Sequence, residues 1–154
     1  MSMTIGDSLP KLTISSTLKE NFNLEEFKGK KLVMYFYPKD NTPGCTQEGK
    51  DFSENYDEFQ KLNTEIVGVS KDSLKKHQNF IDKFNFPFSL IADTEEELCK
   101  AMDVIKEKSM YGKKYMGIER STFIFDEEGI LTHEYRKVRV KGHVEEILET
   151  IQNL

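Results

Sequence analysis

The sequence predicts an α/β fold with a mixed central β-sheet flanked by helices. Apolar runs of strand length alternate along the chain with segments whose apolar residues recur at helical spacing. This order predicts three parallel strands joined by right-handed crossovers. A final hairpin and a closing helix make the sheet mixed. Because the 154 residues contain no repeat, low-complexity tract or linker, we expect a single domain over residues 1–154.

The first half supplies the first central strand and the helix that follows it. The elements expected before this strand are short strands over 11–14 and 18–23 and a helical turn over 24–27. The apolar run 32–37 is typical of a buried strand. Thr42-Pro43 is typical of a helix N-cap followed by proline in the first turn, so a helix is predicted over 43–62. Its apolar face consists of Phe52, Tyr56, Phe59 and Leu62.

The second half repeats the strand–helix pattern and then changes to a hairpin. Asp72-Ser73 supplies an N-cap for a helix over 74–84, which lies between strands at 65–70 and 88–92. The remaining elements are a short helix over 95–102, hairpin strands over 121–125 and 130–135, and a helix that begins near His143. This arrangement is typical of the thioredoxin-like fold. In such sheets the functional loops lie at the carboxyl ends of the strands.

Composition and charge exclude several classes of protein. The net charge of −5 argues against a nucleic-acid-binding surface, and we interpret the basic residues between Lys100 and Lys141 as solvated surface. No apolar run approaches the ~20 residues of a membrane span. Residues 1–10 lack the charged start and apolar stretch of a signal peptide, so we expect a cytoplasmic location and no membrane partner.

The three histidines give no indication of a metal site. His77, His133 and His143 have no paired spacing to one another or to the cysteines. His77 lies on the apolar face of its helix, and we interpret it as a core or boundary residue whose hydrogen bonds are satisfied. His143 is expected to lie in solvent near the start of the last helix.

Cys45 is the most informative residue of the chain. It follows the strand 32–37 and a short loop, and it lies in the opening turn of the next predicted helix. There, unpaired backbone N–H groups and the helix dipole favour the thiolate, which is the nucleophilic form. A cysteine in such a turn can also be a small buried residue. Cys99 is the second of the two cysteines, and two cysteines do not make a disulfide framework. A chemical role is therefore expected for at least one of them.

The residues around Cys45 resemble the active-site motif of the peroxiredoxins, in the form of the Q-type subfamily, also called bacterioferritin comigratory protein. The matching stretch reads Tyr37-Pro38-Lys39-Asp40-Asn41-Thr42-Pro43-Gly44-Cys45-Thr46-x-Glu48. A second segment, 117–126, resembles the family segment that delivers the active-site arginine, here Arg120. The likeness covers nearly the whole chain, and its two motifs occur in the family's order.

The resemblance implies a thiol-dependent peroxidase that reduces hydrogen peroxide and organic hydroperoxides in antioxidant defence, without a cofactor. Cys45 is the expected nucleophile, and it becomes a sulfenic acid as water or an alcohol is released. Arg120 is expected to favour the thiolate and to donate to the peroxide oxygens. Thr42 is expected to bond both the sulfur and the peroxide, Pro38 to pack over the site, and backbone N–H groups near Gly44 to add donors.

Three features leave the family mechanism open. Glu48 either orients Arg120 or compensates the charge of the helix N-terminus. Many Q-type members carry a second cysteine five positions after the first, where this chain has Lys50. Cys99 is then either a core-filling residue or a resolving cysteine that needs local unfolding to reach Cys45.

The reductant and the assembly stay open as well. A thiol of a partner protein can resolve the sulfenic acid, and a bridge between the Cys45 residues of two chains is a third route. By family analogy the reductant is thioredoxin, and glutathione or glutaredoxin is the rival. A monomer or a weak homodimer is expected.

The residues around Cys45 also bear on three other functions. The stretch 44–50 matches a phosphate-binding loop, but Asp51 follows where that loop needs serine or threonine for magnesium. A thiol–disulfide oxidoreductase would need a second cysteine three residues after Cys45, where Glu48 stands. A binding or holdase protein that does not use the thiol is a third class, and it predicts that Cys45→Ser leaves activity unchanged.

Overall fold

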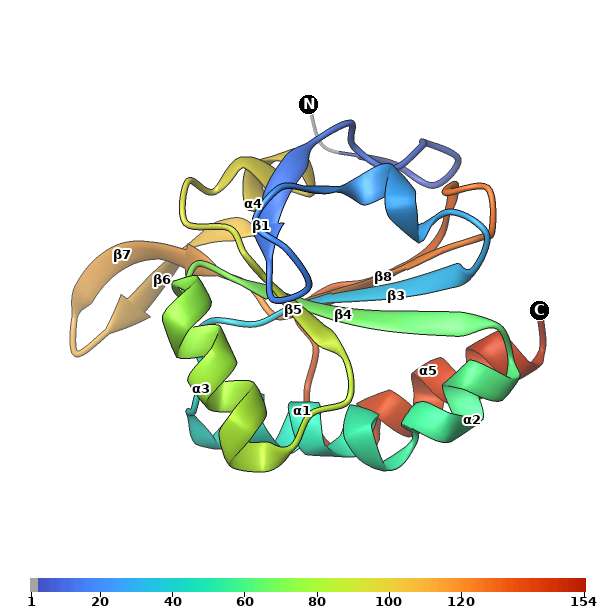
Figure 1. Ribbon diagram of the computed structural model, residues 1–154. Helices are drawn as coiled ribbons and strands as arrows, with labels where there is room; N and C mark the ends of the chain where they lie inside the picture. Colours follow the sequence, from blue (N-terminus) through green and yellow to red (C-terminus); the bar gives the residue numbers. More distant parts are fainter. Residues whose placement is uncertain (1–2) are drawn as a thin grey trace.

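A seven-stranded mixed sheet forms the centre of the molecule in the computed structural model, which describes residues 3–154 (Figure 1). Its strands follow the order β2-β1-β5-β4-β3-β8-β9. Their bounds are β1 Thr13–Ser16, β2 Phe22–Asn23, β3 Lys31–Phe36, β4 Thr64–Ser70, β5 Ser89–Ala92, β8 Ser121–Phe125 and β9 Leu131–Tyr135. Residues 1–2, with which the expected domain begins, lie outside the described part of the chain.

The pairing of the central strands confirms the predicted topology. Strands β3, β4 and β5 run parallel, β8 pairs antiparallel with β3, and β9 pairs antiparallel with β8. The register sets Phe36, the last residue of β3, opposite Ser121, the first residue of β8. Arg120 precedes Ser121, so it lies opposite the point where β3 ends and the loop towards Cys45 begins.

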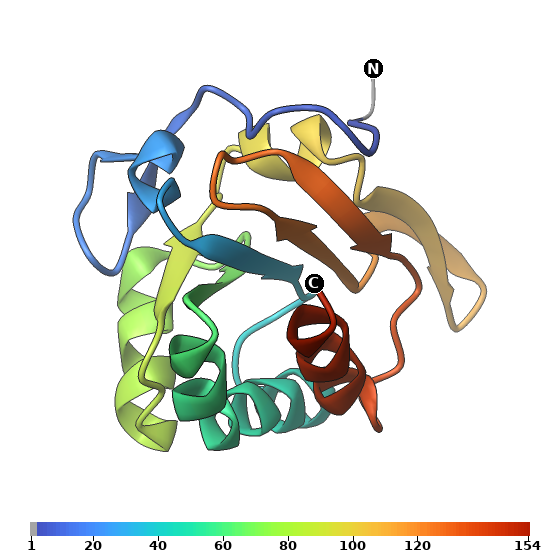
Figure 2. The ribbon, with the colours of Figure 1, turned by 90° about the vertical axis from the view of Figure 1, so that its right-hand side faces the viewer.

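Helices cover both faces of the sheet (Figures 1 and 2). One face carries α1 (Pro43–Glu54), α2 (Tyr56–Lys61), α3 (Leu74–Phe84) and α5 (His143–Gln152), and the other carries the 3₁₀ turn η1 (Leu24–Phe27) and α4 (Glu97–Ala101). Among residues 3–154, no helix has the length and apolar character needed to cross a membrane.

The sheet separates two hydrophobic cores. Successive side chains of a strand point to opposite faces. Met34 and Phe36 of β3 therefore pack in a core with residues of η1 and α4, which we call the α4-side core. Tyr35 and Tyr37 pack with residues of α1, α2, α3 and α5, in what we call the α1-side core. Cys45 belongs to the α1-side core.

The helix predicted over 43–62 is two helices, and the strand bounds near the N-terminus also differ from the prediction. Asn55 separates α1 from α2, and its side-chain amide donates to the backbone carbonyl of Asp51 at 2.9 Å. Such local side-chain bonding competes with the helix, which explains the break. Strand β1 begins two residues later than expected, and β2 covers only the last two residues of the stretch 18–23.

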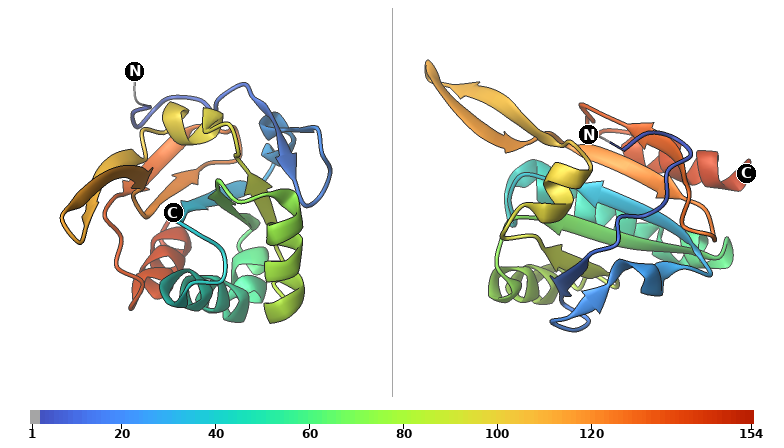
Figure 3. Two further views of the ribbon diagram at one scale, coloured as in Figure 1. Left: turned by 90° about the vertical axis from the view of Figure 1, so that its left-hand side faces the viewer. Right: turned by 90° about the horizontal axis from the view of Figure 1, so that it is seen from above.

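The sequence did not predict the hairpin of β6 (Ile105–Met110) and β7 (Lys113–Ile118), which form a separate two-stranded sheet. The hairpin stands away from the central sheet (Figure 3). Both of its faces are largely exposed, so its sequence shows no alternation of apolar and polar residues. The one local signal is the turn Tyr111-Gly112, in which both residues have positive φ, as the tightest hairpin turns require.

Close packing of the α1-side core generates a prediction about Gly49 of α1. A Cβ atom added to Gly49 would lie 2.5 Å from Cζ of Phe86, whose ring stacks on Phe88 with 5.4 Å between centroids. Gly49→Ala would gain about 1 kcal/mol of helix propensity. Overpacking costs about 1–3 kcal/mol, and this clash is severe. We therefore expect a lower free energy of unfolding, measured by urea denaturation.

The control for this prediction is Glu54→Ala, an exposed position of the same helix. It should change the free energy of unfolding by less than about 0.5 kcal/mol. A Gly49→Ala variant as stable as the parent would mean that the ring of Phe86 moves without cost.

Candidate active site

The first turn of α1 holds Cys45 just beyond the end of β3, and the residue is only 2% exposed. Thr42 is the N-cap with extended backbone angles, and Pro43 occupies the first helical position, as predicted. The backbone N–H of Thr46 closes the first turn by donating to the Thr42 carbonyl at 2.8 Å. The sulfur therefore sits where the helix dipole favours a negative charge.

Arg120 joins Cys45 to Glu48. Its Nη2 donates to the Cys45 sulfur at 3.4 Å, and its Nη1 donates to Glu48 Oε1 at 2.6 Å. Gly44 leaves room for this arrangement, because a Cβ there would lie 3.2 Å from the Nη2 atom. The expected contact of Arg120 with the cysteine is thus present. Of the two alternatives for Glu48, the geometry shows the contact with Arg120, although 72 residues separate the two in the chain.

Burial affects the pKa values of Glu48 and Arg120. Glu48 is fully buried, and its Oε2 atom has no hydrogen-bond partner among the described residues. Burial accordingly raises the pKa of Glu48 to about 7, against the lowering influence of Arg120. Burial also acts to lower the pKa of Arg120, but Glu48 and Cys45 outweigh it and raise that pKa. The guanidinium therefore stays charged and faces the sulfur.

The Thr42 side chain lies differently from what the motif led us to expect, whereas the packing of Pro38 over the site stays a prediction. The Thr42 hydroxyl donates to the backbone carbonyl of Lys39 at 2.9 Å, a bond within the loop rather than one to the sulfur. Pro38 lies two residues after the end of β3 and is exposed. The described geometry thus brings Gly44, Cys45 and Arg120 into one site with Glu48, and it leaves Thr42 turned toward its own loop.

Cys99 lies in α4 and is fully buried in the α4-side core, across the sheet from Cys45. Burial raises the pKa of its thiol, and the neighbouring Asp93 raises it further, so the thiol stays protonated. A disulfide requires Cβ atoms about 4 Å apart. A Cys45–Cys99 bridge would therefore require α1 or α4 to leave its place, and the folded geometry favours the core-filling interpretation.

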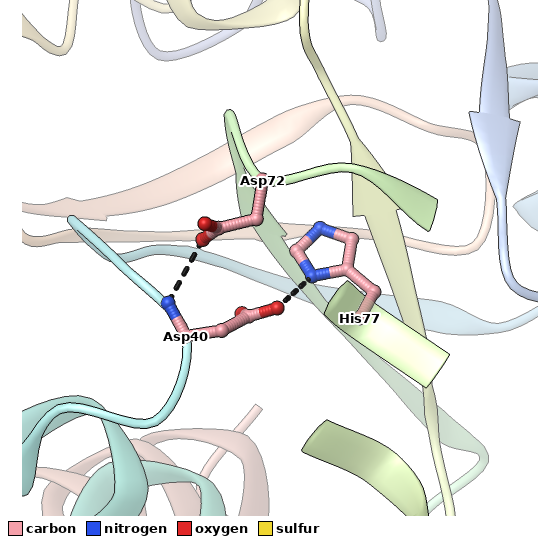
Figure 4. Close-up of side chains that lie close together, drawn as sticks. All are labelled: Asp40, Asp72 and His77. Carbon is pink, nitrogen blue, oxygen red and sulfur yellow. Dashed lines mark hydrogen bonds and ion pairs between the residues drawn. The ribbon is translucent and has the colours of Figure 1, made fainter. Parts of the chain in front are cut away.

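The motif also contains a buried polar network that sequence reasoning missed (Figure 4). Asp40 Oδ2 lies 2.6 Å from His77 Nδ1 of α3, and the Tyr37 hydroxyl donates to Asp40 Oδ1. The backbone N–H of Asp40 donates to Asp72 Oδ2 at 2.8 Å. The network anchors the loop 38–42 to α3 and to the end of β4. A Tyr-Pro-x-Asp motif with a histidine on the helix after the next strand would be its sequence signal.

Asp40, Asp72 and His77 also offer possible metal-ligand atoms within 4.8 Å of one another. The imidazole bonds argue for a hydrogen-bond network instead. His77 Nε2 must donate to the backbone carbonyl of Ile91 at 2.8 Å, because that oxygen only accepts. Nδ1 faces Asp40. Both ring nitrogens are engaged, which confirms the interpretation of His77 as a satisfied core residue.

The expectation for His143 was wrong. Its side chain is buried, and Nε2 lies 2.8 Å from the Thr122 hydroxyl of β8. Burial lowers the pKa of His143, so the ring is neutral at pH 7. The packing of α5 against the hairpin β8–β9 causes this burial, and position in the sequence alone did not indicate it.

The buried network leads to a prediction for His77→Asn. Removing the ring leaves Asp40 buried beside Tyr37 without its main partner, so we expect the free energy of unfolding to fall by about 3 kcal/mol. Urea denaturation measures the change. The matched control is His133→Asn on β9, a half-buried ring whose bond to the adjacent Thr132 is worth about 1 kcal/mol or less. Equal stability of the two variants would contradict the anchoring role.

Comparison with known proteins gives the family. The model of the AhpC/TSA family matches residues 5–134. Peroxiredoxin Bcp of Bacillus subtilis is 49% identical over 154 residues, covering 100% of this chain and 98% of the relative. Peroxiredoxin Bcp of Xanthomonas campestris is 52% identical over 129 residues, covering 84% of this chain and 81% of the relative.

Solved structures agree in fold. A mutant of Xylella fastidiosa PrxQ superposes with a TM-score of 0.93 at 40% identity, over 99% of this chain and 98% of that one. The Bacterioferritin Comigratory Protein of X. campestris superposes with a TM-score of 0.87 at 48% identity, over 92% of this chain and 90% of that one. It was solved as trapped intermediate and ligand complexes in work on alkyl peroxide reduction. The thioredoxin-like fold predicted from the sequence is thereby confirmed. With Cys45 and Arg120 placed together in such a fold, the chain belongs to the AhpC/TSA family, among the Bcp and PrxQ peroxiredoxins.

Proposed function

We propose that Cys45 is the nucleophile with which this thiol-dependent peroxidase reduces hydrogen peroxide and small organic hydroperoxides. The observation that carries the proposal is the Arg120 guanidinium, which bonds the Cys45 sulfur and the buried Glu48 at once. A fixed cation beside the sulfur stabilises the thiolate and points donors at the place where a peroxide must approach. Glu48 fixes the orientation of that cation.

The reaction follows from this placement. The thiolate attacks the terminal oxygen of the peroxide, an S–O bond forms, and the O–O bond breaks. The leaving oxygen departs as hydroxide or alkoxide, takes a proton, and becomes water or an alcohol. Cys45 is oxidised to the sulfenic acid. Arg120 stabilises the charge on the leaving oxygen, and the sulfur supplies both electrons, so the step needs no cofactor. Gly44 and the first turn of α1 contribute backbone N–H groups.

Thr42 and Pro38 keep supporting roles in the proposal. The Thr42 hydroxyl, now bonded to its own loop, can turn toward a peroxide once one is bound. Pro38, the exposed first residue of the loop 38–42, keeps the expected role of limiting access of water to the sulfenic acid. The substrate range includes organic hydroperoxides because a 48% identical X. campestris protein was studied for alkyl peroxide reduction.

Re-reduction of the sulfenic acid is assigned to an external thiol. Lys50 occupies the position of the second cysteine in many relatives, and Cys99 lies on the other side of the sheet. Thioredoxin is the proposed donor, with glutathione or glutaredoxin as the rival, and the overall role is antioxidant defence. The cytoplasmic location and the monomer or weak homodimer stay predictions.

The first test is the intact mass of the reduced protein after one equivalent of hydrogen peroxide. Attack by Cys45 adds one oxygen, about 16 Da, and Cys45→Ser should abolish the gain. Cys99→Ser should leave it unchanged, because Cys99 is buried in the α4-side core. A loss of about 2 Da that either substitution abolishes would instead mean a Cys45–Cys99 disulfide.

The same samples separate the rival functions. Insulin reduction without turnover of peroxide would favour a thiol–disulfide oxidoreductase. Full activity of Cys45→Ser would favour a binding or holdase protein that does not use the thiol. Either result would overturn the peroxidase mechanism through Cys45.

A second test uses the pH dependence of sulfenic acid formation. Glu48 has a pKa of about 7, so it is ionised above that pH and neutral below it. Neutralising Glu48 weakens its hold on Arg120. The ratio of the rate of the parent protein to that of Glu48→Gln should therefore rise as pH increases through about 7. Stopped-flow measurement of the reaction with peroxide gives both rates. A ratio independent of pH would exclude this role.

The stability of the protein should change with pH in the opposite direction. Folding raises the pKa of Glu48 from 4.5 to about 7, so the folded state binds the proton more tightly. The contribution of Glu48 to the free energy of unfolding is fully present below pH 4.5 and is lost as pH rises through about 7. Glu48→Gln should lack this loss, which urea denaturation at several pH values measures.

A further inference from the structure

The hairpin β6–β7 carries more than half of the exposed large hydrophobic side chains of the described residues. In the described residues 3–154, seven large hydrophobic side chains are exposed, and four of them lie in this hairpin or its turn. These four are Met110, Tyr111, Tyr115 and Met116. Tyrosine and methionine are enriched in protein interfaces, and methionine adapts to irregular partners. Their concentration on a segment that stands away from the fold indicates a contact surface (Figure 3).

The hairpin is basic in an acidic chain. Its strands contain four lysines and one glutamate, a net charge of +3, whereas the whole chain carries −5. Lys113 and Lys114 lie beside the turn, next to the exposed Tyr111. The charge and the apolar residues together fit a partner whose contact surface is acidic and partly apolar.

The hairpin also borders the site of Cys45. Strand β7 ends at Ile118, two residues before Arg120. Lys108 of β6 lies opposite Tyr115, and burial together with the charge of Arg120 lowers the pKa of Lys108. The hairpin thus joins the site at its base, where β7 leads through Glu119 to the guanidinium that bonds the Cys45 sulfur. A partner that covers the hairpin down to this base reaches the site.

The chemistry of the site requires a partner there. A sulfenic acid at Cys45 needs two electrons and two protons to return to the thiol, and Cys99 is buried across the sheet. We propose that the hairpin β6–β7 is the docking surface for the dithiol protein that re-reduces Cys45, a protein with an acidic, partly apolar surface around its thiols. This inference rests on the proposed peroxidase function.

The step balances with a dithiol partner. One partner thiolate attacks the Cys45 sulfur, an S–S bond forms, and the S–O bond breaks. The hydroxide that leaves takes a proton and becomes water. The second partner thiol then attacks the mixed disulfide, Cys45 leaves as the thiolate, and the partner ends as its own disulfide. Because Cys45 is only 2% exposed, the first turn of α1 must open before the attack. A partner docked on the hairpin is then positioned to attack the Cys45 sulfur as soon as the turn opens.

The test compares a protein reductant with a small one. The triple variant Met110→Ser, Tyr111→Ser, Met116→Ser is assayed with thioredoxin, with glutaredoxin, and with dithiothreitol. We expect the KM for the better protein reductant to rise at least tenfold. Turnover with dithiothreitol and the rate of sulfenic acid formation should stay unchanged, because none of the three residues touches the sulfur. In a second variant, Lys113→Glu with Lys114→Glu, the KM should rise most at low salt.

The matched control removes exposed apolar residues elsewhere. Ile5→Ser, Leu18→Ser and Leu154→Ser together should leave the KM for the protein reductant unchanged. The docking surface is refuted by an unchanged KM in the hairpin variants, by an equal loss in the control, or by an equal loss with dithiothreitol. It is also refuted if neither protein reduces the parent faster than dithiothreitol does.

A contact between two copies of this chain is the competing role for the hairpin. It is shown if the parent forms concentration-dependent dimers, and if the triple variant abolishes them while its KM is unchanged. That result would overturn the docking of a reductant. Absence of sulfenic acid in the parent itself would overturn the proposed function, and it is measured independently of any reductant.

Discussion

The site depends on one interaction, the contact of the Arg120 guanidinium with both the Cys45 sulfur and Glu48. The sheet makes this contact possible. Pairing of β3 with β8 sets Ser121 opposite Phe36, so Arg120 arrives where the chain turns toward α1. Any slip of this register by one residue would turn the side chains of β8 to the other face. The register that packs the two cores therefore also fixes the position of Arg120.

The interior around this contact contains two polar clusters, and both serve the segment that presents Cys45. Burial opposes the charge on Glu48 and keeps its pKa near 7, while Arg120 opposes that effect. Asp40 and His77 are also buried, but every polar side-chain atom of this pair has a hydrogen-bond partner. One cluster thus remains responsive to pH, and the other fixes the loop 38–42 to α3. The two clusters hold opposite ends of the segment that carries Cys45.

The sheet also places the two cysteines in different environments. Cys45 lies at a helix N-terminus beside a cation, whereas Cys99 fills the α4-side core with a protonated thiol. The proposed assignment of re-reduction to an external thiol rests on this separation. The exposed, basic hairpin β6–β7 is attached directly to the strand that brings Arg120, which links the surface available to a partner with the site that needs one.

The sequence alone determined the α/β order, the parallel central strands and the hairpin β8–β9, and its motifs named Cys45, Glu48 and Arg120, which meet at the candidate site. These follow from local periodicity, caps and a motif, all of which act over short stretches of chain. Tertiary structure decided the rest. The break at Asn55, the burial of His143, the bond between Asp40 and His77, and the separation of Cys45 from Cys99 depend on packing between distant elements. The hairpin β6–β7 escaped prediction because most of it does not pack against either core. Both of its faces are largely exposed, so its sequence carries no apolar pattern.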